Sequence, residues 1–256
     1  MWRIQLIGLQ TMVLKETKRI FRIWAQTLLP SVTSTTLYFL VFGSFIGARI
    51  GSIDGVSYIS FIIPGLIMMS VITNSYSNVV SVVFGAKFQN SIEELLISPL
   101  YTSTIILGWV SSGVIRGSLV GILVLLVSLF FVPLHIAHPL LVLVTLFFTS
   151  LFFSICGVIT ALFAKNFDHL TIVPTFILTP LSYLGGVFYS IAALPEFWQH
   201  VSKLNPIFYL INTFRFGFLG ISDVPISSAL LVLVLLTAGS WQLCYYLVKR
   251  GVGLMT

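Results

Sequence analysis

Six long runs of hydrophobic residues dominate the chain, and polar or turn-forming residues separate them. The runs cover about residues 24–47, 58–84, 103–132, 139–164, 170–189 and 226–248. A helix needs about 20 mostly apolar residues to cross a hydrocarbon core of about 30 Å. The pattern therefore predicts an all-α polytopic membrane protein with six transmembrane helices. The fifth run is the least regular, because Pro174 and Pro180 lie within it.

The composition supports this prediction. Of the 256 residues, 57% are hydrophobic and 8% are charged, and the mean hydropathy is +1.07. A soluble protein with so few charges would expose large apolar patches, which excludes an ordinary cytosolic enzyme and a disordered regulator. The thirteen Lys and Arg residues do not gather into a basic face. We therefore expect a lipid bilayer around the chain and no nucleic-acid partner.

The basic residues predict the orientation of the chain. Six spans place both termini on one side, and Lys and Arg in short loops favour the cytoplasm. The side with the termini would hold nine basic residues, namely Arg3, Lys15, Lys18, Arg19, Arg22, Lys87, Lys165, Lys249 and Arg250. The other side would hold three, namely Arg49, Lys203 and Arg215. We therefore expect both termini in the cytoplasm.

The first 22 residues form a separate element in this prediction. Apolar residues such as Ile4 and Ile7 alternate with basic residues such as Lys15 and Lys18. This mixture is typical of an amphipathic helix that lies in the membrane interface beside anionic headgroups. The alternative is a flank that only sets the topology. Residues 1–22 are thus expected to be an interfacial helix, and residues 23–250 a single six-helix transmembrane domain.

The ionisable residues argue against several kinds of membrane protein. All seven acids fall in predicted loops or at helix ends, namely Glu16, Asp54, Glu93, Glu94, Asp168, Glu196 and Asp223. Ion-coupled transporters usually carry such groups at mid-membrane, and an intramembrane aspartyl protease needs two carboxylates there. His135 and His138 have a metal-like spacing without a third ligand, so we expect no metal site.

The chain also lacks the glycine-rich loop and lysine that bind nucleotide phosphates. We therefore expect no enzyme activity and no cofactor in this chain, and energy for any driven transport must come from another polypeptide.

Arg116 is the one charge deep within a predicted span. It lies 13 residues after Ser103, or about 20 Å along a helix. It also lies among Gly113, Gly117 and Gly121, a small-residue stripe that allows a second helix to approach closely. Two interpretations remain open: Arg116 bonds to neighbouring helices, or it lines a substrate path and contacts an anionic group.

Residues 85–100 predict a short amphipathic helix between the second and third spans. Ser91 and Glu94 have the spacing of a capping box, in which the serine caps the first turn and the glutamate reaches back. Glu93 and Glu94 also favour a helix N-terminus. Leu95, Leu96 and Ile97 form an apolar patch, and Pro99 stops the helix. The segment is either a connector or a docking element for a partner protein.

The segment from Ser190 to Pro225 is too long for a turn and too aromatic for a solvated loop. Pro195 predicts the start of one helical piece, and Asn205 with Pro206 predicts the start of another. The second piece is too short for a full span. We expect re-entrant or interfacial helices before the last span.

Three motifs in register resemble the membrane subunit of type-2 ABC exporters. The first is Phe61-Ile-Ile-Pro-Gly-Leu-Ile-Met-Met69, which is similar to the family's proline-glycine start of the second span. The second is the 91–99 segment, which resembles its coupling-helix motif, and the third runs from Leu204 to Arg215. With the order of the spans, the resemblance covers about residues 20–250.

The resemblance implies a bacterial inner-membrane permease that works as a dimer of two copies on two separate ATP-hydrolysing subunits. It places Ser91, Glu93, Glu94, Leu95 and Leu96 at the contact with the ATPase. The chain departs from the family where Asn90 and Ser91 replace a more usual glycine-threonine pair, and where Gln89 replaces a common basic residue.

The sequence thus predicts the permease subunit of an ATP-driven exporter for an amphiphilic substrate, such as a drug, a lipid-like molecule or a polysaccharide. The alternative is a membrane scaffold or assembly factor without transport activity.

Overall fold

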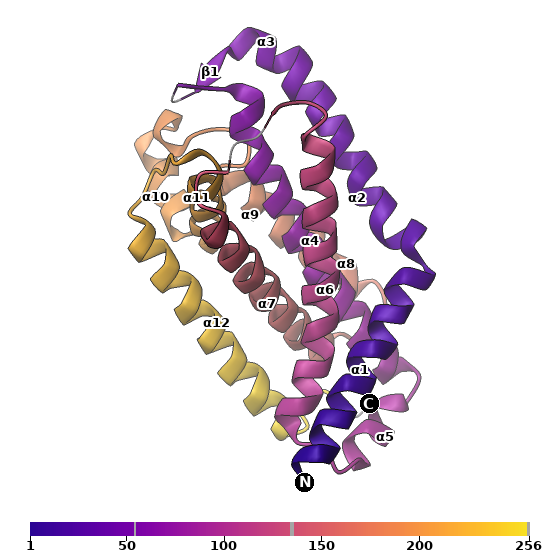
Figure 1. Ribbon diagram of the computed structural model, residues 1–256. Coiled ribbons are helices and arrows are strands. Elements are labelled where there is room, and N and C mark those ends of the chain that lie inside the picture. The colour runs from indigo at the N-terminus through magenta and orange to yellow at the C-terminus, as the bar shows by residue number, and fades with distance from the viewer. Residues whose placement is uncertain (54, 134–135, 255–256) are drawn as a thin grey trace.

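The computed structural model describes residues 1–53, 55–133 and 136–254, and most of them are helical (Figure 1). The longer helices are α1 (Trp2–Arg22), α2 (Trp24–Tyr38), α4 (Tyr58–Phe88), α6 (Thr102–Ser128), α7 (Pro139–Phe163), α11 (Pro206–Leu219) and α12 (Ile226–Lys249). Shorter helical elements are η1 (Phe39–Ile46), α3 (Gly47–Ile50), α5 (Ser91–Ile97), α8 (His169–Val173), η2 (Pro174–Leu178), α9 (Thr179–Leu184), η3 (Ile191–Ala193) and α10 (Glu196–Leu204). The strands β1 (Ser52–Ile53) and β2 (Val56–Ser57) form a small antiparallel pair.

Four helices are long and apolar enough to cross a membrane, namely α4, α6, α7 and α12. They correspond to four of the six predicted spans. The first predicted run is also helical from Trp24 to Ile50, but its middle part, η1, is a π-helix. The fifth run is helical only from His169 to Leu184, because η2 begins at Pro174 and Gly186 leaves the helix with a φ of +80°. The predicted end at residue 189 was therefore wrong.

Helix α4 lies at the centre of the fold and packs against α6 and α7. Glycines make these contacts close: a Cβ at Gly157 of α7 would lie 2.9 Å from the carbonyl oxygen of Tyr76. The predicted small-residue stripe on α6 also faces α4, because a Cβ at Gly113 would lie 2.7 Å from the carbonyl oxygen of Ser75. Close approach to a neighbouring helix is thus the structural use of this stripe.

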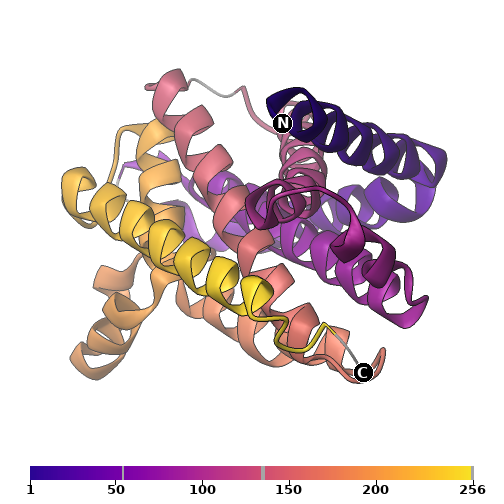
Figure 2. The same cartoon turned by 90° about the horizontal axis from the view of Figure 1, so that it is seen from below.

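The two ends of the helical bundle differ. The start of α1, the end of α12 and the short helix α5 lie at one end, and α3 with the strand pair lies at the other (Figure 1). Seen from below, α1 and α12 lie on opposite flanks of the bundle (Figure 2). This arrangement places both ends of the described chain at the same end of the bundle as the segment that resembles a coupling helix.

Helices α10 and α11 begin where the sequence predicts. Pro195 precedes α10, and the side chain of Asn205 accepts a hydrogen bond from the backbone N–H of Ile207 at the start of α11. Helix α11 enters the core, where Arg215 is 2% exposed and its guanidinium lies 3.9 Å from the centre of the Phe61 ring. Arg215 also donates to the carbonyl of Gly186. Arg215, which the charge count placed on the non-cytoplasmic side, is therefore buried in the core of the protein.

Candidate functional site

Helix α5 follows α4 after a two-residue turn. Asn90 makes this turn in the left-handed conformation, with φ of +56°, which asparagine tolerates better than most residues. The predicted capping box is wrong, because Asn90 is the N-cap and the hydroxyl of Ser91 donates to the carbonyl of Ala86. The proline stop is confirmed: the helix ends at Ile97, and Ser98 is extended before Pro99.

The apolar residues of α5 differ in burial. Ile92 is 1% exposed and anchors the helix, a role that the sequence analysis missed. Leu95 and Leu96 are half-buried and pack against the same core, which includes Val83 and Trp109. Ile97, in contrast, is 85% exposed. The spacing of positions 92, 95 and 96 is the signal of a helix face that packs inward.

Ser91, Glu93 and Glu94 are exposed, so the outer surface of α5 consists of polar residues together with Ile97. The structure therefore brings together the five residues that the sequence placed at a partner contact, but two of them, Leu95 and Leu96, largely serve to hold the helix on its own chain.

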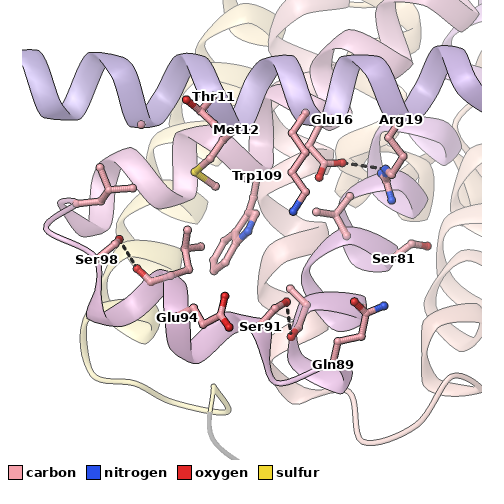
Figure 3. Close-up of a pocket in the computed structure, with 17 residues that line it drawn as sticks. Thr11, Met12, Glu16, Arg19, Ser81, Gln89, Ser91, Glu94, Ser98 and Trp109 are labelled. Carbon is pink, nitrogen blue, oxygen red and sulfur yellow. Dashed lines mark hydrogen bonds and ion pairs between the residues drawn. The ribbon is translucent and has the colours of Figure 1, made fainter.

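A cavity of about 640 Å³ lies between α1, the end of α4, α5 and the start of α6. Figure 3 shows Trp109 between the two helices that flank the cavity, with Met12 and Glu16 on α1 and Ser91 and Glu94 on α5. Its wall is mixed, since polar residues from α1 and α5 alternate with apolar ones. We call this cavity the α1–α5 pocket.

A chain of polar contacts leads from this pocket into the helical core. Glu16 pairs with Arg19 at 2.9 Å, and Arg19 donates to the amide oxygen of Asn78 at 3.0 Å. The amide nitrogen of Asn78 then donates to the hydroxyl of Ser112 at 2.9 Å. Glu16 is 8% exposed, although the sequence placed it among loop and helix-end acids. These contacts connect α1 to α4 and α6.

Gln5 fastens α1 to the segment that follows α5. Its amide nitrogen donates to the carbonyl of Pro99 at 2.8 Å. Its amide oxygen accepts from the backbone N–H of Tyr101 at 2.9 Å and from the hydroxyl of Thr104 at 2.7 Å. The glutamine thereby satisfies an N–H at the start of α6, where helices lack internal partners. No local sequence pattern reveals this contact.

Lys87 joins the end of α4, just before α5, to the end of α7. Its ammonium donates to the carbonyls of Leu162 at 3.3 Å and Ala164 at 3.2 Å, at the end of α7. A cation stabilises a helix C-terminus, where carbonyls lack partners. Lys87, which the charge count placed among the basic residues on the side of the termini, is buried.

Arg116 is not among the residues that line the α1–α5 pocket. Its guanidinium donates to the carbonyl of Thr27 in α2 at 3.2 Å, and Nε makes no hydrogen bond within the described residues. The contact corresponds to the interpretation in which Arg116 bonds to a neighbouring helix. His135 and Asp54 lie outside the described residues, and His138 stacks on Phe216 with ring centres 5.1 Å apart.

Comparison with known proteins identifies the family. Residues 8–219 match the family described as ABC-2 type transporter. The chain is 53% identical to the inner membrane transport permease YadH of Escherichia coli K12, over 99% of each chain. It is 28% identical to nodulation protein J of Rhizobium meliloti, over 77% of this chain and 78% of that one. The chain therefore belongs to the ABC-2 type transporter family, as a membrane permease subunit of an ABC transporter.

Proposed function

We propose that this chain is the permease of an ATP-driven exporter that moves an amphiphilic substrate out of the cytoplasm, and that a separate ATPase contacts it through α5. The observation that carries the proposal is the position of α5, which Ile92 seats on the core while Glu93 and Ile97 remain exposed. An exposed acid beside an exposed large apolar residue fits a protein-docking surface. Ser91 and Glu94 flank this surface.

In this proposal the chain crosses the inner membrane six times, with α2–η1–α3 and α8–η2–α9 as the two interrupted spans, and both termini are cytoplasmic. Burial of Lys87 and Arg215 removes one basic residue from each side of the count, which leaves eight against two. The charge asymmetry that favours a cytoplasmic α5 therefore persists. Helix α1 lies at the interface, since Trp2, Leu6 and Ile7 expose apolar surface along it.

A second copy of the chain completes the permease, as the family resemblance implies, and the ATPase supplies the energy. In this proposal the permease moves its substrate without reacting with it, so the surfaces that the two copies present to the substrate determine which molecules are transported.

The test of this function is co-purification of the permease with its ATPase partner, using Glu93→Ala combined with Ile97→Ala. Removing two exposed anchors at the centre of a docking surface should weaken the complex about tenfold or more. Both positions are exposed, so the fold should be unaffected. Lys203→Ala with Leu204→Ala is the matched control, since it removes an exposed charge and an exposed leucine from α10 at the opposite end of the bundle.

Full association of the Glu93 and Ile97 double variant would contradict the assignment of α5. Stable assembly without ATP-dependent movement of any amphiphile in vesicles would favour the scaffold alternative.

A further inference from the structure

A second hollow lies between α2 and α4, and six of its ten lining residues carry uncharged polar side chains. The other four, Pro30, Tyr38, Leu66 and Met69, give it an apolar surface as well. It has a volume of about 260 Å³. Its polar walls are Ser31, Ser34 and Thr35 from α2 and Ser70, Thr73 and Asn74 from α4. No charged side chain lines it among the residues that the structure describes. We call it the hydroxyl groove.

The hydroxyl groove lies at the middle of a membrane-crossing helix. Thr73 is 15 residues from Tyr58 and 15 from Phe88, the two ends of α4. A 31-residue helix is about 46 Å long at 1.5 Å per residue, so its centre falls within the hydrocarbon region. Polar surface at this depth is costly in contact with lipid, and it is tolerated where it faces protein or a water-filled cavity.

The polar face of α4 continues from the groove to the α1–α5 pocket. Ser70, Thr73, Ser77 and Ser81 follow one another at spacings of three or four residues, which places them on one side of the helix. Ser81 itself lines the α1–α5 pocket. Ser77 is half-buried and Ser81 exposed. A strip of hydroxyl groups therefore connects the end of the molecule that carries α5 to the hydroxyl groove.

Hydrogen bonds hold the two walls of the groove together. The amide nitrogen of Asn74 donates to the hydroxyl of Ser31 at 2.8 Å and to the carbonyl of Ser70 at 2.9 Å. The hydroxyls of Thr35 and Ser70 lie 3.3 Å apart. Among the described residues, neither bond of Asn74 uses its amide oxygen, which can accept from a ligand.

The chemistry of this lining selects for a class of ligand. Hydroxyl and amide groups both donate and accept, so they can replace the hydration of a neutral hydroxylated group. A charged group would lose its hydration without gaining an opposite charge. Tyr38 also lines the groove and adds an aromatic ring to its surface.

We propose that the hydroxyl groove holds an uncharged, hydroxyl-bearing part of the transported amphiphile, such as a sugar ring. The proposal rests on the transport function proposed above and names the substrate class that it serves. The α4 strip provides the path from the α1–α5 pocket to this groove.

The experiment measures the reaction of introduced thiols with a charged, water-soluble thiol reagent in membrane vesicles. Cys156 and Cys244 are the free cysteines of the chain and are first replaced by alanine. Ser70→Cys and Thr73→Cys probe the groove, Ser81→Cys is the accessible positive control, and Leu231→Cys on the exposed apolar face of α12 is the lipid-facing control.

Since a thiol reacts as the thiolate, which forms in water and not in hydrocarbon, the T73C thiol should react about tenfold or more faster than the L231C thiol. An alkyl maltoside should slow this reaction severalfold, whereas an alkyl sulfate and an alkyl trimethylammonium of the same chain length should not. In the otherwise unmodified chain, Thr73→Val should weaken binding of the alkyl maltoside by about three- to tenfold, the effect of losing one neutral hydrogen bond.

Two results would overturn the proposal. If the T73C thiol does not react with the reagent and instead crosslinks to a second copy of the chain, the groove is part of the interface between subunits. If the charged amphiphiles protect as well as the maltoside, the groove does not select neutral groups. The labelling experiment needs neither nucleotide nor the ATPase, so it tests the groove independently of the transport function. If the permease failed to associate with an ATPase, the proposed transport function would be contradicted, and the labelling result would still show whether the groove binds neutral groups.

Discussion

The ammonium of Lys87 lies 3.3 Å from the carbonyl oxygen of Leu162, 75 residues further along the chain. This contact joins the last turn of α4 to the end of α7, directly before the turn that leads into α5. We therefore expect a displacement of α5 to be transmitted to both α4 and α7. The contact also explains how a lysine is accommodated in a buried position without an acidic partner, because the helix-end carbonyls supply the negative charge.

Lys87→Met should therefore lower the stability of the folded protein. Methionine fills a similar volume but leaves the carbonyls of α7 without their donor, which should cost about 1–3 kcal/mol. Thermal unfolding of the purified protein in detergent measures this change. Lys165→Met is the matched control, because Lys165 is close in sequence to the same helix end and is exposed. Equal melting temperatures for the two variants would contradict the proposed role of Lys87.

Gln5→Leu should release α1 from the start of α6. Leucine has a similar size but cannot replace the three hydrogen bonds to Pro99, Tyr101 and Thr104, each worth about 1 kcal/mol. Hydrogen exchange of the backbone N–H of Tyr101 should accelerate by at least about tenfold, since its acceptor is lost. Gln10→Leu, at an exposed position of the same helix, should leave the exchange unchanged. If both variants behave alike, the glutamine does not fasten α1.

These contacts mark the limit of what the sequence could predict. The apolar runs predicted the long helices, because the requirement to cover about 30 Å of hydrocarbon is local. The pattern around Ser91 likewise predicted α5 and its end before Pro99. It did not predict the cap, since the backbone turned left-handed at Asn90 instead. The hydrogen-bond partners of Gln5 are 94 to 99 residues away along the chain. Those of Lys87 are 75 to 77 residues away, so no local sequence pattern contains either set.

The two interpretations of Arg116 can be separated with Arg116→Leu. The hydrogen bond to Thr27 favours a role in joining α6 to α2. Because Nε is buried without a hydrogen bond within the described chain, loss of this charge also removes an unfavourable desolvation. We expect the change in folding stability to stay within about 1 kcal/mol, with export retained. Normal folding together with lost export would instead support Arg116 as part of the substrate path.

The small-residue stripe on α6 gives the most direct test of the packing. A Cβ at Gly113 would lie 2.7 Å from the carbonyl oxygen of Ser75 and 2.5 Å from Val79. Both atoms belong to α4, which also packs against α7, so Gly113→Ala should separate α6 from α4 and destabilise the fold by about 1–3 kcal/mol. The measurement is thermal unfolding, with the yield of monodisperse protein as a second readout.

Gly239→Ala on α12 provides the control for this prediction, since nothing lies within 4 Å of its added Cβ. Alanine there should be neutral or stabilise the helix by up to about 1 kcal/mol, because glycine is the poorer helix former. The two substitutions add the same methyl group to a transmembrane helix and differ only in what the methyl meets. Equal stability of both variants would mean that α6 does not approach α4 as closely as the packing around Ser75 requires.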